Sequence, residues 1–152
     1  MSLRTDMLTE GNILYFDPFY FKNGNLSKSK YFVLLKIVDS NLVIASLPTS
    51  VDAIPEKYEF EQGCLELPDI NFHCYVIQPN FPITECGKSF PLRTLLYGHQ
   101  LDDYSIKTLN DVYPVEGVDY MIWGKLKQEI FQSLLSCFRN SKSVKQKFRK
   151  IL

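Results

Sequence analysis

Residues 30–48 read KYFVLLKIVDSNLVIASLP, and this stretch decides the fold class. Its two halves, 30–38 and 42–48, are rich in β-branched and aromatic residues and are separated only by the polar residues 39–41. Runs of this kind form strands, and a polar connection this short is typical of a hairpin. Pro48 cannot donate to a strand ladder, so a loop is expected to begin there. The stretch therefore predicts an antiparallel β-hairpin.

Further strands are expected on both sides of the hairpin. They are recognised by alternating or continuous apolar positions bounded by glycine and proline. The expected strands are GNILYF (11–16), which Pro18 stops, KYEFEQGCLEL (57–67), FHCYVI (72–77) and a short strand at 93–97.

Helices are expected only after these strands. A first helix begins at Asp103 or Ser105 and runs to Val112, and a second covers 120–139 with Asp119 as its N-cap. The second has a strong apolar stripe, because its large hydrophobic residues recur at i+4. These residues are Leu126, Ile130, Leu134 and Phe138.

The order of elements, strands first and helices last, indicates the architecture. A short third helix with a basic outer face is expected over 144–151. The length suits a single domain, 1–152, with a β core over 11–112 and a C-terminal helical extension over 113–152. The sequence thus predicts an α+β domain, mainly β, in which an antiparallel sheet or small barrel is covered by C-terminal helices.

Composition excludes several classes of protein. Hydrophobic residues make up 45% of the chain and charged residues 22%, which excludes a disordered segment. No apolar run reaches the length of a membrane span, and residues 1–10 lack the apolar core of a secretory signal. We therefore expect a cytoplasmic protein without a membrane partner. In that compartment the four cysteines, Cys64, Cys74, Cys86 and Cys137, are expected to be thiols.

Charge is divided unevenly along the chain although its formal net value is zero. Residues 1–124 hold 16 acidic and 9 basic side chains, whereas residues 125–152 hold 1 and 8. The two parts therefore carry −7 and +7. A basic end of this kind either binds nucleic acid or folds back on the acidic part of its own chain.

Histidines and acidic residues offer few candidates for acid–base chemistry. His99 lies close in sequence to Asp102 and Asp103, so it can act as a base that a carboxylate orients. The alternative is a polar loop that ends in a helix N-cap. Asp17, at the end of the first strand, is a second candidate base, unless it only satisfies groups of the loop.

A metal site is not expected from the cysteines and histidines. His73 and Cys74 are neighbours, with Cys64 and Cys86 within reach in sequence. However, the chain has no Cys-x-x-Cys pair, and adjacent residues of a strand point to opposite faces. No cofactor is predicted.

Aromatic and basic residues are concentrated together near the first loop. Aromatic side chains crowd residues 15–21, and the loop that follows carries Lys22, Lys28 and Lys30. Such groups bind single-stranded nucleic acid by stacking and by charge. Alternatively, the aromatic residues fill the core of a small barrel.

The order of these features resembles the start of the PemK/MazF-type toxins. The family has a Gly-x-aromatic first strand, a loop, an Arg-Pro that opens an apolar strand, and a third strand that closes on a Thr-Ser pair. Here GNILYFDPF is followed by a polar loop, SKYFVLLKIVDSNLVIASLP and Thr49-Ser50. Lys30-Tyr31 stands where the family has Arg-Pro. The resemblance covers residues 11–50.

This resemblance implies an SH3-like barrel, usually a homodimer, that cuts single-stranded RNA without a metal and is neutralised by an antitoxin protein. The implied catalytic residues are Lys30 and Thr49, with Ser50 beside the latter, and Lys22, Lys28 and Lys30 would contact RNA. Lys30 changes the expected chemistry, because an ammonium group holds phosphate as a point charge and not as a bidentate fork. The alternative function is a non-catalytic SH3-like module that binds protein or nucleic acid.

Overall fold

The hairpin of residues 30–48 organises the larger of two sheets. The computed structural model describes residues 9–20, 28–47 and 61–152. Within them, strand β2 (Lys28–Val38) pairs antiparallel with β3 (Asn41–Leu47), as predicted, and Val38 lies opposite Asn41. The turn uses Asp39 with φ +54°, a left-handed conformation that aspartate tolerates better than most residues.

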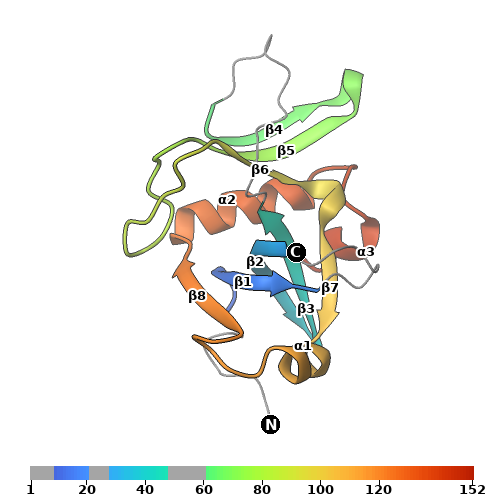
Figure 1. Ribbon diagram of the computed structural model, residues 1–152. Helices are drawn as coiled ribbons and strands as arrows, with labels where there is room; N and C mark the ends of the chain where they lie inside the picture. Colours follow the sequence, from blue (N-terminus) through green and yellow to red (C-terminus); the bar gives the residue numbers. More distant parts are fainter. Residues whose placement is uncertain (1–8, 21–27, 48–60) are drawn as a thin grey trace.

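The larger sheet has five strands in the order β7-β3-β2-β1-β8 (Figure 1). Its remaining strands are β1 (Asn12–Phe19), β7 (Asp102–Ser105) and β8 (Tyr120–Lys125). All pairs of neighbouring strands are antiparallel. β1 continues through Pro18, where the sequence predicted its end, and its register with β2 shifts between Phe16 and Phe19. Proline is tolerated there because the ladder is irregular at that point.

The smaller sheet has three antiparallel strands in the order β4-β5-β6. These are β4 (Gly63–Leu67), β5 (Phe72–Ile77) and β6 (Thr94–Tyr97), and they match the three strands predicted there. β4 begins at Gly63, so it is shorter than the predicted strand 57–67. Residues 57–60 lie outside the described part. A 3₁₀ turn, η1 (Pro68–Ile70), links β4 to β5, and η2 (Gly98–Gln100) links β6 to β7.

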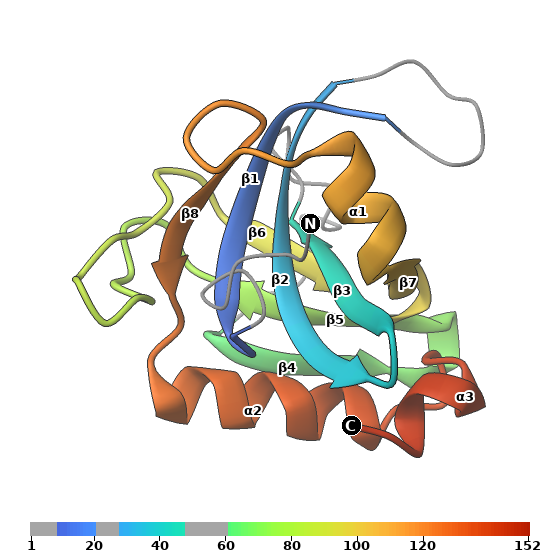
Figure 2. The same ribbon diagram turned by 90° about the horizontal axis from the view of Figure 1, so that it is seen from below.

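Three α-helices follow β7. These are α1 (Ile106–Val112), α2 (Gln128–Arg139) and α3 (Gln146–Arg149). Ser105 is the N-cap of α1, and its hydroxyl accepts a hydrogen bond from the amide of Thr108, as one of the two predicted starts requires. Figure 2 shows α1 and α2 on opposite sides of strands β1 to β3.

The predicted helix over 120–139 is wrong in its first third. Residues 120–125 form β8, which pairs with β1, so the segment after residue 112 contributes a strand to the larger sheet as well as helices. The apolar i+4 stripe begins only at Leu126, and Asp119 is not a cap: its carboxylate accepts the amide of Val115 in the preceding turn. The free edge of β1 decides this segment, because backbone groups there need partners.

The core has two main clusters, one on each face of the larger sheet. Alternate residues of a strand point to opposite faces, so Ile13 enters one cluster and Leu14 the other. The first cluster joins the larger sheet to α2, α3 and the smaller sheet; the second is covered by α1. Leu126, Ile130 and Leu134 of the predicted apolar stripe lie in the first cluster together with Ile13, Val33 and Val43. Val76 of β5 lies in a third, small cluster with Cys74 and Leu95, whereas its neighbours Tyr75 and Ile77 reach the first cluster.

The architecture is α+β, with antiparallel sheets that supply most of the regular structure. In the described part of the chain, the strands form two open sheets and no closed barrel. The same part holds no helix that is long and apolar enough to cross a membrane.

Candidate functional site

Lys30 and Ser46 meet at the end of the β2–β3 hairpin that lies away from its turn. The Lys30 ammonium donates a hydrogen bond of 2.8 Å to the Ser46 hydroxyl. Both residues lie on the face of the sheet to which the buried Phe32 and Ile44 belong, because strand alternation places them there. All four side chains line a pocket of about 460 Å³, which we call the Lys30 pocket. Ser46 therefore holds the Lys30 cation at the wall of a pocket.

His99 reaches the same pocket from a different part of the chain. It lies in η2, between a strand of the smaller sheet and β7. Because Asp102 of β7 pairs with Ile44 of β3, the turn that carries His99 is held beside the hairpin. His99 and Asp102 both line the Lys30 pocket. Of the two candidate bases in the sequence, His99 is thus the one that the fold brings to Lys30.

The aspartates near His99 have different surroundings. Asp102 lines the pocket, and its carboxylate accepts the amide of Asp103 at 2.8 Å. Asp103 forms an ion pair of 4.0 Å with Lys147 of α3. Neither caps α1, because Ser105, the other predicted start of this helix, has that role.

The basic C-terminal segment borders the site. Lys145 lines the Lys30 pocket, and Lys142 lines an adjoining pocket of about 630 Å³, in which His99 also takes part. Both lysines are exposed, as predicted for this segment. Lys147, by its contact with Asp103, shows that part of the basic charge faces the chain's own acidic residues. The alternative in which the basic end folds back on acidic residues therefore holds for Lys147, and binding of nucleic acid by the exposed lysines stays a prediction.

An aromatic pocket of about 280 Å³ adjoins the Lys30 pocket. Tyr104 lines both, and Phe19, Tyr20 and Tyr113 line the aromatic pocket. Tyr113 stacks on Phe19 with ring centroids 5.6 Å apart, and its hydroxyl accepts the amide of Tyr20. Tyr20 is 59% exposed, so this pocket presents an aromatic surface to solvent. Phe16 and Phe19 belong to the core, which confirms the core interpretation for them, whereas Tyr20 does not, and its stacking on a nucleic-acid base stays a prediction.

Burial changes the acidity of the tyrosines in this region. It raises the pKa of Tyr104 to about 12, with smaller effects from the nearby Asp102 and Tyr113. Burial also raises the pKa of Tyr113, against the effect of the Tyr20 amide. Both tyrosines are therefore neutral hydrogen-bonding groups at neutral pH.

Several residues singled out in the sequence lie elsewhere. Thr49, Ser50 and Lys22 lie outside the described residues, and of Lys28 only the backbone is described, opposite Phe19. Asp17 accepts a hydrogen bond of 2.7 Å from the hydroxyl of Ser29 on β2, and it is not among the residues that line the Lys30 pocket. Sequence reasoning missed Ser46 and Tyr104, whose only signal was their polarity, and gave Lys145 only as part of the basic end, because strand pairing and helix packing bring these residues to the site.

The cysteines differ from the expectation of four thiols. Cys64 of β4 and Cys137 of α2 form a disulfide with a Cα–Cα distance of 5.4 Å, while Cys74 is buried and Cys86 exposed as thiols. The irregular spacing in sequence gave no sign of this pair, because docking of α2 on β4 brings residues 73 positions apart together.

His73 lies beside this disulfide. Its Nε2 atom is 3.3 Å from the sulfur of Cys137 and 3.9 Å from that of Cys64. Burial lowers the pKa of His73, with Glu66 acting in the opposite direction, so the imidazole is neutral at neutral pH. The prediction that His73 and Cys74 lie on opposite faces of their strand is correct, because Cys74 lies in the third core cluster and His73 lies beside the disulfide. The partner that completes the group, Cys137, comes from α2.

Comparison with known proteins supplies no relative for this arrangement. No protein-family model, no curated protein and no solved structure matches the chain.

Proposed function

We propose that the Lys30 pocket is the active site of a metal-independent endoribonuclease that cleaves single-stranded RNA. The observation that carries the proposal is the presence of His99, Lys30 and Lys145 around one pocket: a candidate base and two cations. RNA cleavage without a metal needs these functions, a group that takes a proton from the 2′-hydroxyl and positive charge beside the phosphate.

The reaction follows from these roles. His99 takes the proton of a 2′-hydroxyl, whose oxygen attacks the adjacent phosphorus. Lys30 and Lys145 stabilise the charge that develops on the phosphoryl oxygens. The bond from phosphorus to the 5′-oxygen breaks, and that oxygen takes a proton from water or from a lysine ammonium. The products are a 2′,3′-cyclic phosphate and a 5′-hydroxyl.

The aromatic pocket supports single-stranded RNA as the substrate. A base adjacent to the scissile phosphate can stack on the exposed ring of Tyr20, because this pocket adjoins the Lys30 pocket at Tyr104. Stacking on an aromatic side chain contributes about 1–3 kcal/mol per base and needs an unpaired base. Double-stranded RNA cannot present such a base.

Because residues 11–50 resemble the PemK/MazF-type toxins, we extend the proposal to the biological role of a toxin that an antitoxin neutralises. In this form, the fold is a variant of the SH3-like barrel, the chain is a growth inhibitor that works as a homodimer, and Thr49 and Ser50 assist Lys30. An antitoxin with an acidic segment would bind across Lys30, Lys142 and Lys145. Expression without such a partner should then stop growth of the host cell, and the mass in solution should be that of a dimer.

The decisive experiment is cleavage of single-stranded RNA in the presence of a chelator. We expect His99→Ala to lower the rate by about 10²–10⁴-fold, the usual contribution of a general base. Lys30→Ala and Thr49→Ala should also lower it, whereas Lys30→Arg should raise it, since a guanidinium holds two phosphate oxygens at once.

A matched control is Lys107→Ala. Lys107 is exposed on α1, pairs with Asp111, and is not among the residues that line the Lys30 pocket, so this variant loses one positive charge away from the site. Its rate should equal that of the wild type. If wild type, His99→Ala and Lys30→Arg all show the same background rate, the protein is no ribonuclease, and RNA binding without cleavage would favour the non-catalytic binding module.

A further inference from the structure

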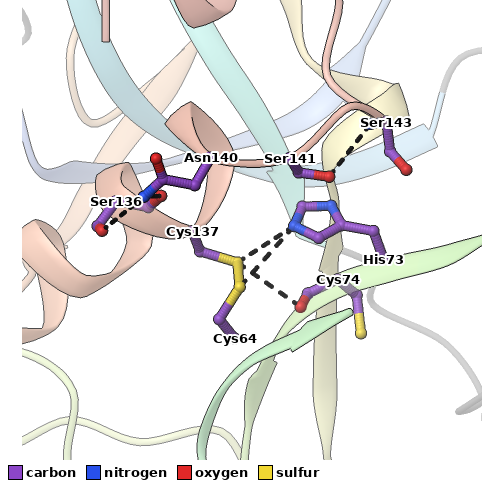
Figure 3. Close-up of a disulfide and its surroundings, with 8 residues drawn as sticks. All are labelled: Cys64, His73, Cys74, Ser136, Cys137, Asn140, Ser141 and Ser143. Carbon is purple, nitrogen blue, oxygen red and sulfur yellow. Dashed lines mark hydrogen bonds between the residues drawn. A yellow bond between two sulfur atoms is a disulfide. The ribbon is translucent and has the colours of Figure 1, made fainter. Parts of the chain in front are cut away.

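Three potential metal ligands converge between the smaller sheet and α2. They are Cys64 on β4, His73 on β5 and Cys137 on α2, and the donor atoms all lie within 4.8 Å of one another (Figure 3). In Figure 3 the imidazole of His73 directs Nε2 toward both sulfur atoms. No part of the proposed ribonuclease reaction uses these residues.

We propose that the reduced protein binds one Zn²⁺ ion through the sulfurs of Cys64 and Cys137 and the Nε2 atom of His73. Zinc bonds of about 2.3 Å to sulfur and about 2.0 Å to nitrogen, arranged as a tetrahedron, place neighbouring ligand atoms roughly 3.5–3.8 Å apart. His73 Nε2 is already 3.3 Å and 3.9 Å from the two sulfurs. The imidazole is therefore in position, and only the sulfurs must separate.

The ligand types select the metal. Two thiolates and one imidazole form a soft set that suits zinc and disfavours magnesium or calcium, which take oxygen ligands. Cys137 and His73 are buried, whereas Cys64 is exposed. The fourth zinc position is thus open to solvent on the Cys64 side, where a water molecule completes the tetrahedron.

Disulfide and zinc exclude each other at this place. A phosphine reductant donates two electrons to the disulfide. One phosphine, one water and the disulfide yield one phosphine oxide and two thiols. Zn²⁺ then displaces the two thiol protons as the thiolates bind it. In either state β4 remains joined to α2 across 73 residues of sequence, so the zinc preserves the cross-link that the disulfide provides.

The test is titration of the full-length, phosphine-reduced protein with Zn²⁺ against a chromogenic chelator. We expect one zinc per chain, release of two protons, and no tight binding by the oxidised protein. With Co²⁺ in place of zinc, thiolate ligation should give a sulfur-to-cobalt charge-transfer band. Cys64→Ser should weaken binding by more than about 100-fold, since the loss of outer-shell partners alone costs about 10–100-fold.

Controls come from the chain itself. Cys86→Ser and Cys74→Ser remove the two cysteines outside the group and should bind zinc like the wild type. His73→Gln tests the imidazole without removing a sulfur, and circular dichroism of each variant reports its folding. The proposal is overturned if the reduced wild type binds no zinc, or if folded Cys64→Ser binds it as tightly as Cys86→Ser does. Since the RNA assay contains a chelator, its result is independent of this one.

Discussion

Replacement of Gly98 by alanine tests how closely the turn before His99 packs against the core. A Cβ atom at this position would lie 2.6 Å from Nδ1 of His73, and 2.8 Å from both Cε1 of that ring and Cγ2 of Val144. Favourable contacts between such atoms have separations of about 3.5–4.0 Å. The added methyl group therefore overlaps two neighbours by roughly 1 Å.

Neither neighbour can move cheaply. His73 is 3% exposed and lies against the Cys64–Cys137 disulfide, and Val144 is 1% exposed within the first core cluster. Overpacking of a filled core costs about 1–3 kcal/mol, and the rigid surroundings place this variant in the upper half of that range. We expect Gly98→Ala to lower the free energy of unfolding by about 2–3 kcal/mol.

Urea unfolding of the oxidised proteins measures this effect. With a slope of about 2 kcal/mol per molar urea, the midpoint should fall by roughly 1–1.5 M. Val144→Ala removes one of the overlapping atoms, so the double variant Gly98→Ala, Val144→Ala should be less destabilised than the sum of the two single variants, by about 0.5 kcal/mol or more. A midpoint for Gly98→Ala within error of the wild type, or strict additivity, would refute the packing described here.

Four further predictions concern the core, pH and salt. Ile130→Ala should lower the free energy of unfolding by about 2–5 kcal/mol in urea titrations because the side chain is buried on α2; a loss below about 0.5 kcal/mol, typical of exposed sites, would contradict the docking of α2. Because the folded protein holds His73 with a pKa below its ordinary value of 6.5, the unfolded state binds the proton first, and stability should fall as pH drops below about 6.5; His73→Gln should reduce this slope. Tyr104, with its pKa raised to about 12, keeps its proton longer when folded, so stability should fall between pH 10 and 12, less so in Tyr104→Phe. Affinity for single-stranded RNA should drop steeply from 50 to 200 mM salt, and Lys145→Ala should reduce the log–log slope by about 0.7, the value for one phosphate contact; binding that is insensitive to salt would exclude the basic segment as a contact.

Local pattern in the sequence was sufficient for most of the secondary structure. The hairpin β2–β3, the strand β5 and the helix α1 each combine a periodic apolar pattern with a turn or cap residue, such as Ser105, and these signals agree with each other. The α+β class follows from the same elements in their order. Such features are local, since they depend on residues a few positions apart.

Tertiary pairing decided what local pattern left ambiguous. Residues 120–125 are apolar enough for the start of a helix, yet the unpaired edge of β1 takes them as a strand. Val76 differs from its neighbours Tyr75 and Ile77 only in the face on which it lies, and that face follows from where the smaller sheet docks. A shift of one residue in the register of a strand moves each of its side chains to the opposite face of the sheet.

The candidate sites show the same division. The sequence by itself determined which residue types were present for chemistry, among them Lys30 and His99, because charge and acidity belong to the side chain. Only the tertiary structure decided which of them meet: it brought His99 to Lys30 through the pairing of β7 with β3, and Cys137 to His73 through the docking of α2. These contacts join positions more than 60 residues apart, and no spacing along the chain encodes them, because the packing of whole elements sets the distance between their side chains.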